Sequence, residues 1–200
     1  MPSIYVHEIN PHSAVNGPGR RAVVWVQGCS LGCPGCFNPQ THPGSPVGTP
    51  YDPDELGETL ALPDLDGLTV SGGEPLEQAE ATGALIRAFR RKHNGTVLLF
   101  TGMTVERILT SPTARETILG ADAVLSGPYV AHAESTAIWH HKRLLQITGR
   151  IPPDALIPER RLEIGINRQG RIHLTGYPDS ERLQMLTSLL GKEKAARDKR

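Results

Sequence analysis

The chain is poor in cysteine. Of its 200 residues only Cys29, Cys33 and Cys36 are cysteines, and they lie within one short segment. An odd number of thiols cannot be fully paired in disulfides, and a structural zinc site normally requires four protein ligands. Three clustered thiolates do suit a 4Fe-4S cluster that keeps one iron free, because such clusters are held by cysteine thiolates. An open iron can bind a reactive molecule.

The sequence also lacks net charge, long apolar segments and an export signal. Lys+Arg and Asp+Glu both total 21, so we expect no nucleic-acid partner. No segment approaches the roughly 20 apolar residues that span a bilayer, so we expect no membrane association. Residues 1–7 contain neither the basic nor the apolar region of a signal peptide. Grouped thiols without an export signal fit a reducing compartment, and we expect a cytoplasmic protein.

Strand-like and helix-like segments alternate along the first 125 residues, which predicts an α/β fold with a parallel sheet. Residues 39–50 are rich in Pro, Gly, Ser and Thr and are expected to be irregular. We expect residues 1–150 to form one domain and residues 151–200 to form an extension packed on it. The expected strands are 4–9, 22–26, 65–71, 96–100 and 123–125, the helices are 52–61, 76–93, 105–109 and 114–119, and the extension contains a hairpin (161–166 and 171–175), a helix (179–190) and a charged tail (191–200).

Four polar or glycine-rich segments follow the expected parallel strands. They are the cysteine segment, Ser71–Pro75, Thr101-Gly102 and Ser126–Pro128. Ligands of parallel α/β folds collect at the carboxyl ends of the strands, so these segments should lie at one edge. The pair Gly72-Gly73 would let a ligand approach the backbone, where free N–H and C=O groups can bind a zwitterion.

Two of these motifs resemble those of the radical S-adenosylmethionine (SAM) superfamily. Cys29-x3-Cys33-x2-Cys36 is similar to its cluster motif, and Gly72-Gly73-Glu74-Pro75 is similar to the motif that binds the methionine amino group of SAM. Within the superfamily, the chain most resembles the activating component of anaerobic ribonucleotide reductase and related glycyl-radical-enzyme activases. This narrower resemblance covers roughly residues 5–149 and rests on residues 17–20, 27–29, 33–38, 101–104 and 126–129.

The resemblance implies an incomplete, TIM-like barrel of the radical SAM type, followed by the hairpin and helix. It implies that each cysteine ligates one iron and that SAM chelates the fourth. One electron would then cleave SAM to methionine and a 5′-deoxyadenosyl radical, with no side chain acting as acid, base or nucleophile. Gly35 stands where many members carry an aromatic residue, and Phe37 supplies the aromatic later, as in the reductase activases. The implied SAM-binding residues are Gly35, Phe37, Ser71, Gly72, Gly73 and Glu74.

The implied substrate is a protein, a glycyl radical enzyme such as anaerobic ribonucleotide reductase. A single small domain has little material with which to enclose a large pocket, which favours this reading. The implied electron donor is of low potential and resembles flavodoxin or ferredoxin. Two other functions stay open: a radical SAM enzyme acting on a peptide, carbohydrate or nucleoside, and a zinc-binding module without redox activity.

Several of these residues also have simpler interpretations. His42 completes a Cys3His set of plausible zinc spacing. Gly72-Gly73 fits a tight strand-to-helix turn, and Glu74 fits a first-turn acid that favours the helix dipole. The hydroxyls of Thr101 and Ser126 could bind SAM or satisfy local backbone groups. The pair His140-His141 fits either a ligand role or a solvated loop.

Overall fold

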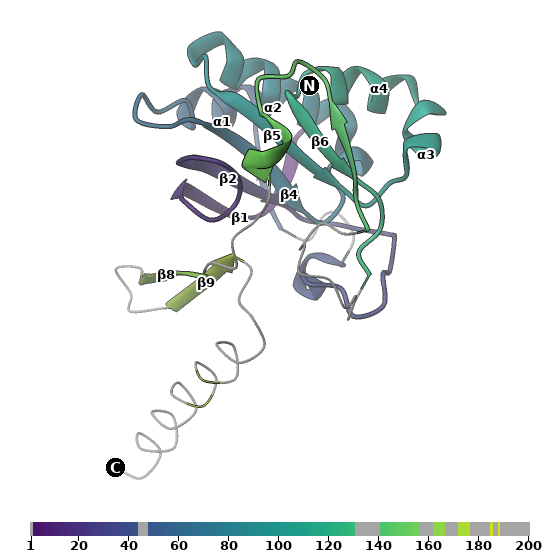
Figure 1. Ribbon diagram of the computed structural model, residues 1–200, viewed down its shortest axis with the longest axis horizontal. Helices are drawn as coiled ribbons and strands as arrows, with labels where there is room; N and C mark the ends of the chain where they lie inside the picture. The colour runs from purple at the N-terminus through teal and green to yellow at the C-terminus, as the bar shows by residue number, and fades with distance from the viewer. Residues whose placement is uncertain are drawn as a thin grey trace.

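The computed structural model describes residues 2–43, 48–130, 141–156, 162–166 and 172–176, together with Met185 and Ser188. Its centre is an open seven-stranded sheet in the order β3-β1-β2-β4-β5-β6-β7 (Figure 1). The inner strands β2, β4, β5 and β6 are mutually parallel, whereas β1, β3 and β7 run antiparallel to their neighbours. The carboxyl ends of four strands therefore share one edge.

The bounds of the elements follow the chain in order. The strands of the sheet are β1 (Ile4–Ser13), β2 (Arg21–Val26), β3 (Thr49–Tyr51), β4 (Gly67–Gly72), β5 (Thr96–Thr101), β6 (Ala123–Ser126) and β7 (Arg143–Gln146). The α-helices are α1 (Pro53–Thr59), α2 (Ala79–Lys92), α3 (Val105–Leu109) and α4 (Pro112–Leu119), and the 3-10 turns are η1 (Pro39–Thr41), η2 (Pro75–Gln78) and η3 (Pro153–Leu156). A separate two-stranded sheet contains β8 (Leu162–Ile166) and β9 (Ile172–Gly176).

The predicted α/β class and the order of its central strands and helices are confirmed. Three details were wrong: β1 continues to Ser13, residues 49–51 form an edge strand, and β7 was not expected. Among the described residues, the edge strands β3 and β7 do not pair, so no closed barrel forms. The hairpin is confirmed by the antiparallel pairing of β8 with β9. The helix expected at 179–190 and the tail at 191–200 lie outside the described residues, apart from Met185 and Ser188.

The main core lies between the sheet and the helices that cover one of its faces (Figure 1). Helix α1 starts where the sequence predicts, because the Asp52 carboxylate accepts hydrogen bonds from the N–H groups of Asp54 and Glu55 and Pro53 opens the first turn. Helix α2 buries Leu85, Ile86 and Phe89 completely. No helix in the described part of the chain is long and apolar enough to cross a membrane.

The opposite face of the sheet holds a buried polar residue that the sequence did not reveal. The Arg21 side chain is fully buried, and its guanidinium donates to Thr69 Oγ1, Thr96 Oγ1 and the carbonyl oxygens of Leu68 and Thr96. Burial lowers the pKa of Arg21 to about 10, so the group is still charged at neutral pH. These bonds join β2, β4 and β5 at their amino ends, opposite the edge that carries the cysteines.

The hairpin is attached at the carboxyl end of β1, which lies beside the amino end of β2. The Glu163 carboxylate makes most of the contacts. Glu163 on β8 accepts hydrogen bonds from Asn10 Nδ2 at 2.8 Å, Ser13 Oγ at 3.3 Å and the N–H of Ala14 at 2.9 Å. On β9, Thr175 Oγ1 accepts from Asn16 Nδ2 at 3.0 Å. The hairpin therefore lies at the amino end of β2, away from the cysteine segment.

Candidate functional site

The three cysteines lie on an irregular loop that leaves the carboxyl end of β2. The N–H of Gly28 donates to the Thr41 carbonyl, which closes residues 28–41 into a loop over this edge. All three thiols are free and half-buried. Gly32 and Gly35 hold φ angles of 60° and 65°, a conformation that glycine adopts without steric cost. The loop thus carries the thiols by backbone turns and not by a helix or a strand.

The electrostatics of the loop oppose a bare thiolate. Burial raises the pKa of Cys29, and the nearby Glu74, Glu77 and Cys33 act in the same direction. A bound iron would offset this cost, because a coordinating thiol is deprotonated by the metal. Free, partly shielded thiols on one loop therefore fit the ligand set of a 4Fe-4S cluster.

Among the described residues, no group of three or more His, Cys, Asp and Glu side chains is placed to hold a single metal ion. In a cubane cluster each thiolate binds a different iron, so its ligands need not converge on one point. A zinc ion would require that convergence.

Gly72 and Gly73 lie directly under the start of the cysteine loop. Gly72 has a φ of 106°, and an added Cβ would overlap the backbone of Trp25 and Val26. A Cβ at Gly73 would overlap the carbonyl oxygen of Gly28. The double glycine is thus needed for the close approach of two backbone segments, whatever else it binds.

The backbone groups of this turn are only partly free. The N–H of Gly73 donates to the Val26 carbonyl and the N–H of Glu74 donates to the Gly28 carbonyl, both at 2.8 Å. The expectation of free N–H groups at the turn was wrong for these two. A ligand ammonium requires acceptors, so carbonyl oxygens are the groups that the turn could offer to SAM.

The Glu74 side chain is fully buried and joins two strand ends. Its carboxylate accepts from Leu76 N–H at 2.9 Å, Thr101 Oγ1 at 2.6 Å and Gly102 N–H at 2.7 Å. Burial raises the pKa of Glu74, and the three donors act against that rise. The bond to Leu76 N–H makes Glu74 the N-cap of η2. This role is close to the simpler interpretation of Glu74 as an acidic residue in the first turn of a helix.

The other implied residues occupy the same edge in different ways. Ser71 is half-buried and pairs in register with Trp25, whereas Gly35 and Phe37 are exposed on the loop. The hydroxyl of Ser126 donates to the Met103 carbonyl at 2.7 Å, and that of Thr101 is engaged with Glu74. Both hydroxyls therefore satisfy local protein groups.

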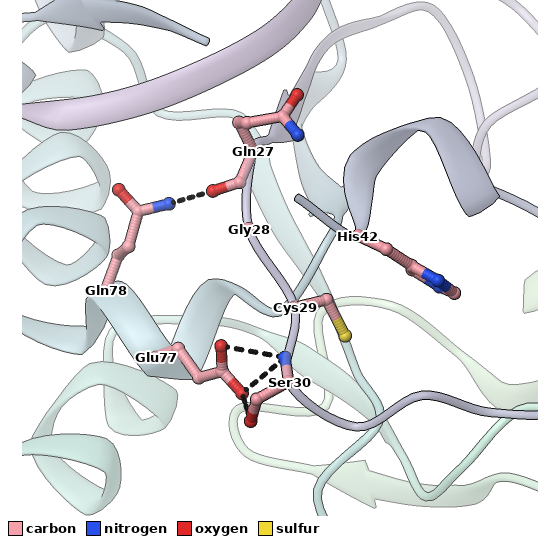
Figure 2. Close-up of a pocket in the computed structure, with 7 residues that line it drawn as sticks. All are labelled: Gln27, Gly28, Cys29, Ser30, His42, Glu77 and Gln78. Atoms are coloured by element: carbon pink, nitrogen blue, oxygen red, sulfur yellow. Dashed lines mark hydrogen bonds between the residues drawn. The ribbon is translucent and has the colours of Figure 1, made fainter. Parts of the chain in front are cut away.

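A cavity of about 340 Å³ opens beside Cys29. Figure 2 shows the Gln27–Ser30 segment crossing it, with Glu77 and Gln78 of η2 on one side and the Cys29 sulfur and His42 on the other. Glu77 accepts from Ser30 N–H and Oγ, and Gln78 Nε2 donates to the Gln27 carbonyl. The His42 Nε2 is buried and has no hydrogen-bond partner among the described residues. His140 lies outside the described residues, and His141 is exposed.

Sequence reasoning missed one charged residue of this edge, Lys142. Its Nζ donates to the Gly127 carbonyl at 2.6 Å and to the Thr101 carbonyl at 3.1 Å. No motif marks Lys142, because the pairing of β7 with β6, and not the local sequence, brings it to this edge.

Residues 15–148 match the family described as a 4Fe-4S single cluster domain. The matched range contains the three cysteines and the Gly72–Glu74 turn. It covers two thirds of the chain and leaves the hairpin outside.

Several curated relatives are similar to the chain. A putative glycyl-radical enzyme activating enzyme of Haemophilus influenzae is 38% identical over 90 residues, which cover 42% of this chain and 34% of the relative. The anaerobic ribonucleoside-triphosphate reductase-activating protein of Pasteurella multocida is 29% identical over 140 residues, covering 64% and 87% respectively. A pyruvate formate-lyase-activating enzyme of Listeria monocytogenes is 37% identical over 83 residues, covering 38% and 32%.

The chain thus spans about a third of the Haemophilus and Listeria relatives and most of the Pasteurella relative. The resemblance to glycyl-radical-enzyme activases, expected from the motifs, is confirmed by these similarities.

Proposed function

Because the chain belongs to the family of 4Fe-4S single cluster domains, we propose that it is a radical SAM enzyme that activates a glycyl radical enzyme. Cys29, Cys33 and Cys36 would each ligate one iron of a single cluster, and SAM would occupy the remaining iron. When bound, the cluster supplies the electron that cleaves SAM to methionine and a 5′-deoxyadenosyl radical.

The chain's own residues would bind and orient SAM and would exclude competing hydrogen donors. The carbonyl oxygens of the Gly72-Gly73 turn would accept the ammonium of SAM, beside Ser71, Gly35 and Phe37. Glu74 would hold the ends of β4 and β5 in place through its bonds to Thr101 and Gly102. These contacts would fix the edge against which the cysteine loop packs.

One observation carries the proposal. The only three thiols of the chain lie on one loop at the carboxyl end of β2, and the backbone of that loop contacts the Gly-Gly-Glu turn of β4. An auxiliary cluster held by four cysteines is impossible with three. The chain's thiols therefore suit one cluster with one open iron.

Anaerobic reconstitution with iron and sulfide tests this function directly. The wild-type protein should bind about four irons, turn brown and, after reduction, convert SAM to 5′-deoxyadenosine. Cys33→Ala should lose both the cluster absorption and SAM cleavage. A colourless protein that binds zinc and leaves SAM intact would instead support the zinc-binding alternative, and cleavage by the Cys33→Ala protein would refute the ligand assignment.

We propose an anaerobic ribonucleoside-triphosphate reductase as the protein substrate. The similarity to the Pasteurella activating protein covers 87% of that relative, more than the similarity to the pyruvate formate-lyase-activating enzyme does. The open sheet would be the incomplete barrel, and its open side would receive a glycine-bearing loop of the partner. Electrons would come from a low-potential flavodoxin- or ferredoxin-like donor.

Electron paramagnetic resonance of a reductase mixed with reduced protein and SAM tests the substrate. A glycyl doublet is expected on the reductase and should be absent with the Cys33→Ala variant. SAM cleavage without any doublet would favour another substrate, such as a peptide, carbohydrate or nucleoside.

A further inference from the structure

Lys142 holds a position that the fold creates and no motif announces. It directly precedes β7, and the pairing of Ser126 with Arg143 brings it to the carboxyl end of β6. Its Nζ bonds to the Thr101 and Gly127 carbonyls join the ends of β5 and β6. The ammonium therefore lies on the same edge as the cysteine loop.

The contact between this edge and the loop is direct. A Cβ added at Gly102, next to Thr101, would overlap the Leu31 side chain of the cysteine loop. Burial lowers the pKa of Lys142. Three groups around the site, Glu74, Cys33 and Cys36, act in the opposite direction. The thiols of Cys33 and Cys36 are thus electrostatic neighbours of this lysine.

The hydrogen-bond partners of Lys142 carry no charge. Within the described part of the chain, its Nζ has no carboxylate within ion-pair distance and is bound only by two neutral carbonyls. A largely desolvated cation is costly unless a negative group lies nearby. Glu74 is one such group, and thiolates with an iron–sulfur core that gains an electron would be another.

We propose that Lys142 is a positioning residue that makes the cluster easier to reduce. The inference rests on the proposed function, since it requires that Cys33 and Cys36 hold the cluster. One electron from an external reductant converts the 4Fe-4S core from the 2+ to the 1+ state, and no bond forms or breaks in that step. The fixed ammonium stabilises the added negative charge and so raises the reduction potential.

Redox titration with dithionite and mediators, followed by electron paramagnetic resonance, tests this role in the reconstituted protein. Lys142→Met keeps the stem of the side chain but removes the charge. We expect a roughly tenfold lower ratio of reduced to oxidised cluster at a fixed potential, which is the effect of one charge at a separation of about 12 Å and an effective dielectric of about 20. For one electron this corresponds to about 59 mV.

Two matched variants separate charge from structure. Lys142→Arg keeps the charge and should retain a potential close to wild type. Arg143→Met removes an adjacent charge that is exposed to solvent, and screening should leave the potential unchanged. If the Lys142→Met variant fails to hold its cluster, the Lys142→Gln variant is measured in its place. Its amide is neutral and can still donate to both carbonyls.

An unchanged potential in Lys142→Met or Lys142→Gln with full cluster content would overturn the inference. So would an equal fall in Lys142→Met and Lys142→Arg, because the geometry and not the charge would then matter. A wild-type protein that assembles no cluster would instead refute the proposed function.

Discussion

At the scale of single residues, Gly73 is a position of the site that leaves no room for a side chain. A Cβ there overlaps the Gly28 carbonyl oxygen, a backbone atom that cannot move away without displacing the loop. We expect Gly73→Ala to shift the loop and to reduce iron bound after reconstitution at least severalfold. Iron and sulfide content, together with the visible absorption of the cluster, measures this loss.

Gly32, on the cysteine loop itself, provides the matched control. Its φ of 60° is a left-handed conformation, but no atom lies within 4 Å of an added Cβ. Gly32→Ala should cost only about 1 kcal/mol of conformational strain and should still assemble the cluster. Equal cluster content in both alanine variants would show that the close approach at Gly73 is unimportant.

Asp122 governs a second residue-scale prediction, on stability in acid. Its carboxylate is fully buried and accepts from Val97 N–H, Arg90 Nη2 and Thr148 Oγ1. Burial acts to raise the pKa of Asp122, but the hydrogen bonds from Thr148, Val97 and Arg90 outweigh it and lower the pKa. The native state therefore favours the charged form more than the unfolded state does.

The stabilisation from Asp122 should be complete above the unfolded-state pKa of about 3.9 and be lost as the pH falls through the lower folded-state pKa. We expect Asp122→Asn to cost about 3 kcal/mol in the free energy of unfolding at pH 7, because it leaves buried donors poorly satisfied. Its stability should also fall less steeply in acid. Urea unfolding of the cluster-free protein between pH 7 and pH 3 measures both effects, with Asp154→Asn, at an exposed position of η3, as control. Parallel acid slopes for wild type and Asp122→Asn would contradict the assignment.

Sequence and structure agree unevenly at this scale. The cysteines and the Gly-Gly turn could be predicted because each has few chemical alternatives at its spacing. Lys142 and Asp122 could not, since each acquires its role from segments between 15 and 41 residues away. A lysine that binds two carbonyls has no local signature.

At the scale of elements, Glu163 is expected to control attachment of the hairpin. It supplies three of the hydrogen bonds that join β8 to β1 and the following loop. A two-stranded hairpin alone is marginally stable, so Glu163→Ala should increase hydrogen exchange of the β8 and β9 amides. Mass spectrometry of exchange in peptides covering 162–176 measures this.

The control for that variant is Ile166→Thr, at a position 71% exposed. It keeps a β-branched residue in the strand, and exchange should stay close to wild type. Unchanged exchange in Glu163→Ala would mean that other contacts hold the hairpin.

The missed elements have a common physical cause. Strand β3 contains Pro50 and, within the part of the chain that the structure describes, pairs only with β1; β7 is a short strand of partly exposed residues at the other edge. Edge strands lack the continuous apolar pattern of strands buried on both faces, such as β2. The extension of β1 to Ser13 likewise depends on its irregular pairing with β2. Pairing partners, and not local sequence, decide all three.

At the scale of the whole molecule, the hydrophobic core does not depend on the cysteine loop for its packing. The main hydrophobic core draws its buried residues from β1, β2, the later strands and helices α1–α4, and it includes none of the described residues between 27 and 55. The second, smaller core lies between β5, β6 and residues 144–156. Neither core requires the loop that would carry the cluster.

The cluster-free protein should therefore remain folded. Apolar burial is the dominant stabilising term in folding, and it is intact in both cores without the metal. We expect far-UV circular dichroism and cooperative urea unfolding to survive removal of the cluster with ferricyanide and EDTA. Hydrogen exchange should rise only around residues 28–42, because ligation ties three points of that loop together.

Cys33→Ala provides the genetic equivalent and should match the stripped protein in both measurements. Global loss of exchange protection in β4 and β5 after stripping would contradict this separation, since these strands belong to the core. Such a loss would show that the cluster organises the sheet edge through the Gly28–Glu74 backbone bond. A change confined to the loop would mean that the fold presents the three thiols before iron arrives.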